Sequence, residues 1–285
     1  MGPDEETVEP GLETEELAQK INPFWEQPYQ LARAVARRWR KPEAKTEIEP
    51  TIASTHQEDI LSTRDKKNKR ELGADSANVV LFVELEDDGS AIYKPVSGEQ
   101  PYLRHGIEAG TYYQRERAAY LVDRFLGLGL VPPTVIRELD GEIGSLQQFI
   151  PETTGSWGVD LSQLQEDLYQ LWVFDYIIWN TDRHSGNLLF QGNKLFAIDH
   201  GLSFGSECRM FMRHFYDIAA PKQLVGLLEQ FLKDDKSKKI LQELLEELLS
   251  EDEVKACVRR IEHIGSKLIK NGMIKLNEDS IFNPE

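Results

Sequence analysis

The stretch NTDRHSGNLLFQGNKLFAIDHG, residues 180–201, decides the expected fold and chemistry of this chain. Asp182 and Asn187 come before an apolar strand, a Gln-Gly-Asn turn and a second apolar strand, and Asp199 follows the second strand. Such a hairpin presents a carboxylate and an amide at its start and another carboxylate at its end. Phosphate transfer from ATP needs this set, because one Asp orients or deprotonates the attacking hydroxyl while an Asn and a second Asp hold Mg²⁺.

Strand and helix patterns upstream and downstream of this stretch predict an α+β fold. Residues 78–85 and 91–96 read as strands joined by an Asp-Gly turn, with Lys94 near the end of the second. An apolar stripe predicts a helix over 112–126 that stops at Gly127 and Gly129. A further hairpin is expected at 131–151, and the chain is mainly helical from residue 163 onward. The sequence thus predicts a strand-rich lobe followed by a helical lobe.

The expected domain organisation has three parts. They are an N-terminal extension at 1–73 (acidic tail 1–19, basic amphipathic helix 28–41, polar linker 43–72), an N-lobe at 74–152 and a C-lobe at 153–285. The basic helix has two interpretations. A basic amphipathic helix with tryptophan can lie on an anionic membrane as a peripheral contact, or it can dock on the acidic body of the same protein.

Composition narrows the function classes. A net charge of −16 argues against a nucleic-acid partner, because such binding depends on Lys and Arg at phosphates. Cys208 and Cys257 lie far apart without metal-ligand spacing, so neither a disulfide framework nor a zinc site is expected. No apolar run approaches the roughly 18 residues of a membrane span, and the N-terminus lacks signal-peptide features. We therefore expect a cytoplasmic protein.

The spacing of these residues matches the protein-kinase pattern in several places. Asp182 and Asn187 are spaced as in H-R-D-x-x-x-x-N, Asp199 opens a DHG where D-F-G would stand, and Lys94 matches the lysine that binds ATP phosphates. The expected fold is therefore the two-lobed protein-kinase-like one. One departure is that no G-x-G-x-x-G precedes the lysine. A short polar loop with Ser76 and Asn78 is expected to approach the phosphates instead.

The segment LQQFIP, residues 146–151, is expected to connect the lobes. Main-chain groups around Gln148 and Ile150 would then hydrogen-bond the adenine of ATP. The same residues are equally compatible with a plain strand end.

Longer motifs carry a family resemblance. FDYIIWNTDRHSGNLLF and KLFAIDHGLSF resemble the catalytic and metal-binding motifs of the phosphatidylinositol 3-/4-kinase-like superfamily, in particular type II phosphatidylinositol 4-kinases and bacterial relatives. YKPVSGEQP resembles the lysine motif of that group, and RERAAYLVDRFLGLGLVPPTV resembles the following helix and strand of bacterial members. HipA-type and Fam20 kinases are more distant relatives with a similar layout. The resemblance covers about residues 76–220.

The resemblance implies roles for individual residues. Asp182 is similar to the catalytic aspartate, Asn187 and Asp199 to the metal ligands, and Lys94 to the phosphate-binding lysine. His184 would act on the transition state or, alternatively, brace the loop by a hydrogen bond. Arg183 is a further candidate in the same catalytic motif, and we expect it to brace the loop rather than to touch the substrate. Asp175 either braces the same loop or lies on an exposed helix face.

The acid that pairs with Lys94 has three candidates. Glu116 lies on the helix after the lysine strand, which is the usual kinase position, but helical geometry puts it away from the apolar stripe. Glu99 and Glu108 compete with it. We prefer Glu116, which requires the helix to be packed on two sides.

The expected reaction is transfer of the γ-phosphate of ATP to a hydroxyl, with Mg²⁺ or Mn²⁺ as the metal. A protein Ser or Thr, including autophosphorylation, is the preferred acceptor, and phosphatidylinositol is the alternative. Cationic and apolar residues alternate in the segment 202–217 after Asp199, which suits a membrane, a peptide or a packed loop. A nucleotide-binding pseudokinase and an AMP transferase remain open as other classes.

Overall fold

The structure is a computed structural model, and it describes residues 54–72, 78–101, 103–155, 159, 164–205 and 217–275. Several predicted features lie outside these residues: the acidic tail, the basic helix 28–41, Ser76, Cys208 and residues 206–216 of the segment after Asp199.

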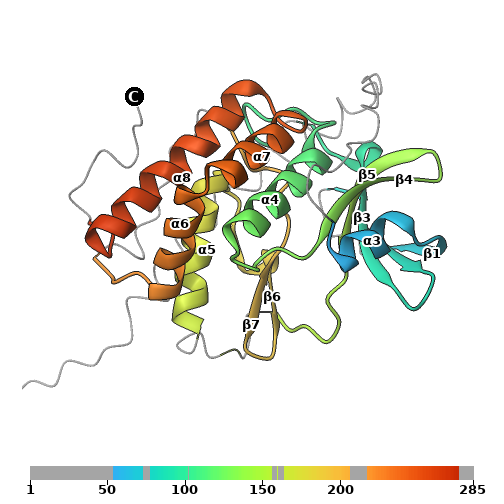
Figure 1. Cartoon of the computed structure of the whole chain (residues 1–285). Coiled ribbons are helices and arrows are strands. Elements are labelled where there is room, and N and C mark those ends of the chain that lie inside the picture. Colours follow the sequence, from blue (N-terminus) through green and yellow to red (C-terminus); the bar gives the residue numbers. More distant parts are fainter. Residues whose placement is uncertain are drawn as a thin grey trace, which may run out of the picture. The chain divides into compact units, whose positions relative to one another are not determined.

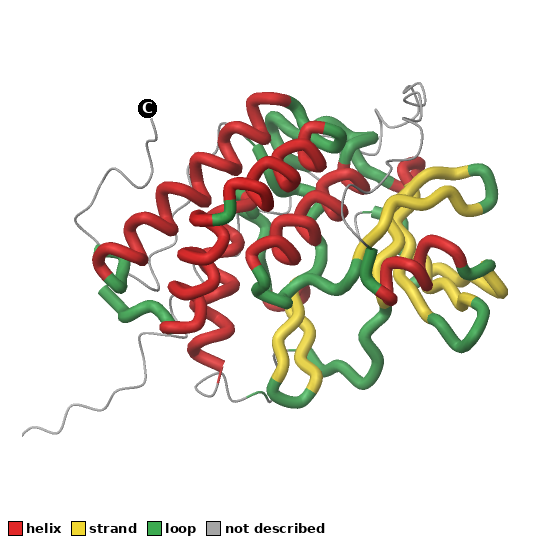
Figure 2. The backbone as a smooth tube through the Cα atoms, in the orientation of Figure 1, coloured by secondary structure: helices red, strands yellow, loops and turns green. Residues whose placement is uncertain are grey.

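An antiparallel sheet of five strands forms the first lobe, in the order β1-β2-β3-β5-β4 (Figures 1 and 2). The strands are β1 (Lys66–Glu71), β2 (Leu81–Leu85), β3 (Ser90–Pro95), β4 (Thr134–Leu139) and β5 (Glu142–Gln148). In β3 alternate side chains are buried, which is the period-2 pattern of a strand with one covered face. The predicted hairpins at 78–96 and 131–151 are confirmed.

The prediction of a linker at 43–72 is wrong for residues 54–72, which form part of the sheet lobe. Helix α3 (His56–Thr63) packs on β4 and β5, and strand β1 pairs antiparallel with β2. Hydrophobic periodicity could not reveal them. Five of the six residues of β1 are exposed, and Leu61 is the one apolar side chain of α3 that is buried. An exposed edge strand needs no apolar face, since it is held through backbone hydrogen bonds to one neighbour.

Helix α4 (Tyr112–Leu126) lies between the sheet and the helices of the second lobe (Figure 1). It contacts β4 and β5 on one side and α5, α6 and α7 on the other. Gly127 ends the helix in the left-handed conformation, with φ of 71°, as the sequence predicts. Because α4 is covered on two sides, charged residues on both of its faces are buried.

The second lobe is mainly helical, as predicted. It contains α5 (Gln165–Ile178), α6 (Lys222–Lys233), α7 (Asp235–Glu246), α8 (Glu251–Asn271) and the separate hairpin of β6 (Leu188–Gln191) and β7 (Lys194–Ala197). Helix α5 is buried along its last ten residues, because the neighbouring helices and the β6-β7 hairpin share one core with it. The predicted boundary between the lobes, after residue 152, stays a prediction.

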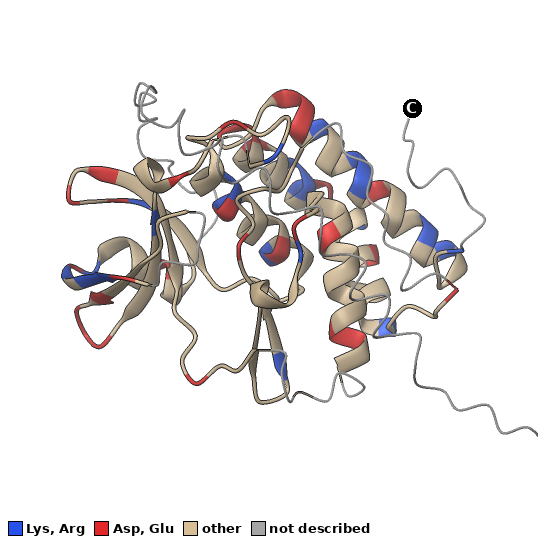
Figure 3. Cartoon of the chain, turned by 180° about the vertical axis from the view of Figure 1, so that it is seen from behind, with Lys and Arg blue, Asp and Glu red and all other residues tan. Residues whose placement is uncertain are grey.

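Charges are distributed over both lobes. Figure 3 shows Asp and Glu on the sheet and on the helices, with Lys and Arg interspersed among them. Within the described ranges, no helix is long and apolar enough to cross a membrane.

Candidate active site

The predicted catalytic hairpin, residues 182–199, is closed by its own backbone and amide groups. The Asn187 side-chain Nδ2 donates to the carbonyl oxygen of Asp182 at 3.1 Å, and Ile198 N donates to the Asn187 carbonyl at 3.1 Å. Asp199 follows β7 with φ of 62°, in the left-handed region where Asp is tolerated better than most residues. The arrangement brings Asp182, Asn187 and Asp199 to one end of the β6-β7 hairpin.

Arg183 and Asp175 form a buried brace beneath this hairpin. The guanidinium donates to both carboxylate oxygens of Asp175 at 2.9 Å, and also to the carbonyl oxygens of Asn187 and Ile198. Asp175 is 1% exposed, which rules out the exposed helix face considered for it. A bidentate pair of this kind fixes direction as well as distance. Arg183 therefore holds the loop in place rather than facing an acceptor.

Asp182 is half-buried beside the brace. Burial raises the pKa of this carboxyl, and the charge of Asp199 raises it further, while His184, Arg104 and Arg183 act in the opposite direction. His184 makes the expected bracing hydrogen bond, since its Nδ1 accepts from Gly186 N at 3.1 Å. His184 is otherwise exposed, so this hydrogen bond does not prevent its ring from contacting a transition state.

Lys94 lies between two carboxylates at the interface of the lobes. Its Nζ is 2.5 Å from Glu116 Oε1 on α4 and 2.9 Å from Asp199 Oδ1. Burial alone would lower the pKa of Lys94, but Asp199 and Glu116 outweigh it and raise this pKa. The pKa of Glu116 is lowered, because Lys94 and a hydrogen bond from His200 oppose its desolvation. We call Lys94, Glu116 and Asp199 the lysine cluster.

His200, the middle residue of DHG, is packed behind the lysine cluster. It is fully buried, with its ring edge-on to Phe174 at 5.8 Å, and its backbone N donates to Glu116 Oε2 at 3.0 Å. Burial lowers the pKa of the imidazole, which therefore stays neutral at pH 7. The residue was not singled out from the sequence, although its place in the motif was a signal for a buried ring.

The other candidates for the partner of Lys94 lie elsewhere. Glu99 accepts from the backbone N–H groups of Gly110, Tyr112 and Tyr113, so it caps the start of α4. Glu108 is exposed. The preference for Glu116 therefore agrees with the geometry, and it holds because α4 is packed on two sides.

The residues expected around the nucleotide are only partly placed. Asn78 Oδ1 accepts from Gln100 N at 2.8 Å and so fastens the loop after β3. Gln148 N donates to the Pro133 carbonyl at 2.8 Å, which leaves that N–H unavailable for adenine. Ile150 is buried at the start of the connector, and its predicted main-chain contact stays a prediction.

Three arginines that sequence reasoning missed hold the backbone at the end of α5 and just after Asp199. Arg104 precedes α4, Arg115 lies on α4 and Arg260 lies on α8. They donate to the carbonyl oxygens of Trp179 and Leu202, of Ser203, and of Ile177, respectively. Backbone carbonyls carry no sequence signal, so only the tertiary structure could reveal these contacts.

The donor set fits a hard divalent cation held together with phosphates. Asn187 donates its Nδ2 to the Asp182 carbonyl within the loop. Asp199 is half-exposed, and its Oδ1 accepts a hydrogen bond from Lys94. Mg²⁺ is commonly bound by one or two protein oxygens plus substrate phosphates. Among the described residues, no group of three or more His, Cys, Asp or Glu side chains is placed to hold a metal by itself.

Comparison with known proteins gives partial matches to curated relatives. The chain is 31% identical over 156 residues to "Protein Rv2133c" of Mycobacterium tuberculosis, covering 42% of this chain and 55% of that protein. It is 34% identical over 134 residues to "Phosphatidylinositol 4-kinase gamma 5" of Arabidopsis thaliana, covering 36% of this chain and 21% of that protein. The chain thus spans about half or less of the length of these relatives.

Solved structures share the fold at low identity. A "Golgi casein kinase" matches with a TM-score of 0.50 and 17% identity, covering 75% of this chain and 74% of that one. The Helicobacter pylori "proinflammatory kinase CtkA" matches with a TM-score of 0.50 and 13% identity, covering 74% and 94%. These likenesses confirm the two-lobed protein-kinase-like fold.

The family described as phosphatidylinositol 3- and 4-kinase matches residues 78–257, which is more than half of the chain. That range contains the lysine cluster, the catalytic hairpin and most of the helical lobe. The description of this family names a kinase, which is a phosphotransferase that acts on a hydroxyl group. The chain belongs to the phosphatidylinositol 3- and 4-kinase family.

Proposed function

We propose that this chain uses ATP and a divalent cation to phosphorylate Ser or Thr hydroxyls of proteins, itself among them. The observation that carries the kinase assignment is the lysine cluster. A lysine on a strand, an acid on the next helix and an acid after the β6-β7 hairpin meet at the interface of the two lobes. In kinases this arrangement positions the phosphates and the metal.

Each residue has a role in the proposed reaction. Lys94, held by Glu116, would bind the phosphates, and Asn187 and Asp199 would hold Mg²⁺ or Mn²⁺ on them. Asp182 would orient the acceptor hydroxyl and take its proton, while Arg183 and Asp175 keep the loop in place.

Charge supports a protein acceptor over a lipid in a bilayer. The chain carries a net charge of −16, and an acidic protein is repelled by an anionic membrane surface. Phosphatidylinositol is the second candidate, supported by the description of the family and by the names of the plant relatives. Peripheral membrane contact through residues 28–41 belongs to this second candidate.

The test is transfer of label from γ-³²P-ATP with Mg²⁺ or Mn²⁺. The acceptors are the protein itself, casein and phosphatidylinositol vesicles, offered separately. We expect label in protein, and we expect Asp182→Ala and Asp199→Ala to abolish it. Asp234→Ala is the matched control, because this exposed carboxylate accepts hydrogen bonds from Lys236 and Ser237 at the start of α7, and the variant should keep full transfer.

The other outcomes identify the competing functions. Label that enters only the vesicles would assign the second candidate. No label from γ-³²P-ATP, with transfer from α-³²P-ATP, would assign AMP transfer. ATP binding with no transfer of either label would identify a pseudokinase.

A further inference from the structure

Glu58 on helix α3 is buried where an acid would ordinarily be exposed. It is 2% exposed, and its two carboxylate oxygens pair with Arg117 Nη1 at 2.7 Å and Arg124 Nη1 at 2.8 Å. Both arginines lie on α4, two helical turns apart, and therefore on one face of that helix. Burial opposes the charge of Glu58, but the hydrogen bond from Thr55 and the two arginines lower its pKa.

The position of Glu58 is fixed from the side of α3 as well. Glu58 Oε2 accepts from Thr55 N at 2.9 Å, and Thr55 Oγ1 accepts from Glu58 N at 3.2 Å, which is a capping box. At the other end of α3, Arg137 on β4 donates to the carbonyl oxygens of Leu61 and Arg64. Helix α3 is thus joined to the sheet at its end and to α4 through Glu58.

The same helix α4 carries Glu116, the member of the lysine cluster that pairs with Lys94. Glu116 and Arg117 are consecutive, so their side chains project roughly 100° apart around the helix. Arg117 also donates to the Thr134 carbonyl on β4 at 2.5 Å. A rotation or shift of α4 relative to α3 that separates Glu116 from Lys94 would therefore strain the pairs with Glu58.

We propose that Glu58 is a positioning residue that sets α4 so that Glu116 meets Lys94. The proposal goes beyond the family assignment, because the family match begins at residue 78 and α3 ends at residue 63. A segment that precedes the family domain thereby controls the active form of its nucleotide site. The proposal rests on the proposed kinase function for one of its two readouts only.

The first variant is Glu58→Gln, which removes the charge while Gln still serves at the third position of a capping box. We expect kcat for phosphate transfer to fall about 2- to 30-fold, the usual range for residues that act on a site through a packed element. Fold retention is verified by far-UV circular dichroism and by the melting temperature. Glu58→Gln with wild-type kcat would overturn the proposal.

The second readout is independent of catalysis. Modification of Lys94 by an amine-reactive probe, followed by mass spectrometry, reports how accessible its amine is. Glu116 Oε1 lies 2.5 Å from Lys94 Nζ, so a displaced α4 removes this contact and leaves the amine more open to the probe. We expect labelling of Lys94 in Glu58→Gln to be at least about threefold faster. If wild type transfers no phosphate, the proposed function fails, yet this rate still tests the role of Glu58.

Two further comparisons separate positioning from plain stability. Thr55→Ala weakens the cap of α3 without removing the ion pairs, and it should label Lys94 at the wild-type rate. If it labels as fast as Glu58→Gln, the ion pairs are not the cause and the proposal is wrong. In an Arg117→Gln, Arg124→Gln background, adding Glu58→Gln should change nothing further; an undiminished effect there would also refute it.

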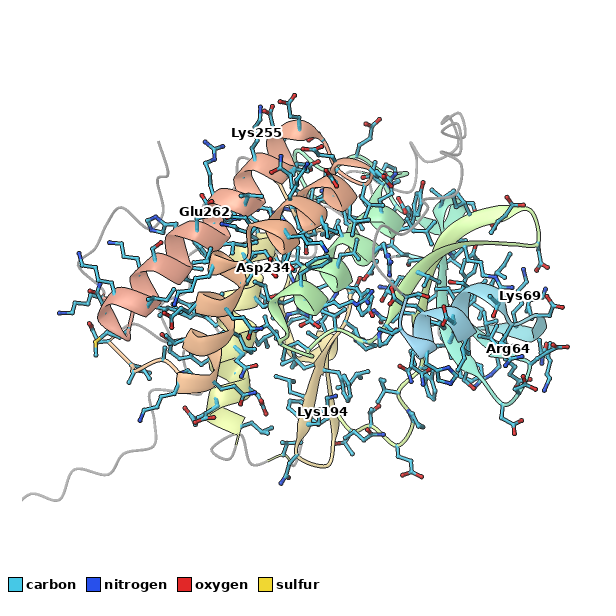
Figure 4. The ribbon with its side chains drawn as sticks, viewed as in Figure 1. Arg64, Lys69, Lys194, Asp234, Lys255 and Glu262 are labelled. Carbon is cyan, nitrogen blue, oxygen red and sulfur yellow. The ribbon has the colours of Figure 1, made fainter. Side chains whose placement is uncertain are left out.

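The matched ion-pair control is Glu251→Gln on α8. Glu251 pairs with Lys255 on the exposed side of that helix. Figure 4 shows Lys255 on α8 well separated from Arg64 and Lys69 beside α3 and β1. This variant should have wild-type kcat and wild-type Lys94 labelling. A change as large as that of Glu58→Gln would show that the effect is not specific to α3.

Discussion

The catalytic hairpin and the lysine cluster meet at Asp199 but are assembled in different ways. In the hairpin, the brace joins residues eight positions apart and the amide of Asn187 reaches back five positions to Asp182. In the lysine cluster, Lys94 bonds to partners that are 22 and 105 residues away. The hairpin can keep its geometry within one segment, whereas the cluster depends on how the lobes and α4 are held.

The two halves of the site, the catalytic hairpin and the lysine cluster, therefore contribute differently to stability and to catalysis. A contiguous loop with a buried brace is a unit whose loss costs stability as well as chemistry. An assembled cluster can lose its geometry while every element stays folded, so it is a place where control can be exerted. Glu58 acts on that second half only.

The largest expected effect is on the hairpin at Asp182. We expect Asp182→Asn to lower kcat by about 10²–10⁴-fold, the usual contribution of a general base, with KM for ATP within about twofold of wild type. The amide retains the shape of the side chain, so the melting temperature should not change. Steady-state kinetics with the acceptor found by the labelling test measures both constants. A loss smaller than tenfold would show that Asp182 is not the base.

The next effect tests whether the hairpin is a structural unit. Arg183→Gln leaves Asp175 buried without its partner, which typically costs about 3–5 kcal/mol of unfolding free energy. The melting temperature should fall by on the order of 10 °C. Denaturant and thermal unfolding measure the loss. Glu58→Gln should cost clearly less, because Gln keeps the capping box and the arginines left behind are 17% and 23% exposed. Equal losses would remove the distinction between the two halves.

The smallest effect concerns the start of α4. Burial raises the pKa of Glu99 to about 7 from its ordinary 4.5, so between these values the folded chain binds a proton that the unfolded chain releases. Its contribution to stability therefore falls as pH rises from about 4.5 to 7. Glu99→Gln removes this titration. The unfolding free energy of the variant should therefore depend on pH less steeply than that of wild type, by at most about 1.4 kcal/mol per pH unit.

Urea unfolding of wild type and Glu99→Gln between pH 5 and 8 measures the two slopes. Asp123, whose pKa burial also raises to about 7, is present in both proteins and cancels in the comparison. Parallel curves would mean that Glu99 does not titrate in this range.

The sequence predicted those parts of the site that depend on local spacing. Asp182, Asn187 and Asp199 belong to a strand-turn-strand pattern that can be read directly, and the helix of Glu116 has a clear apolar stripe. The sequence did not predict α3, because its buried side chains include an acid. The signal that could have found it is the capping box, since Thr55 and Glu58 have the required spacing.

Other contacts had no signal at all. Arg104, Arg115 and Arg260 donate to carbonyl oxygens, which every residue carries, so their partners follow from tertiary packing alone. Glu99 could not be assigned to the N-terminus of α4 rather than to Lys94, because the loop between them sets the distance.

Strand β1 determines where this domain can be cut. A fragment that starts at residue 78, where the family match begins, would lack β1 and would leave β2 as an unpaired edge. Val83 and Leu85 of that strand are buried in the full chain. An unprotected, apolar edge of this kind recruits strands from other molecules. Such a fragment should therefore self-associate in solution. In the full chain, β1 with its sequence KKNKRE covers the edge of β2 and prevents this pairing.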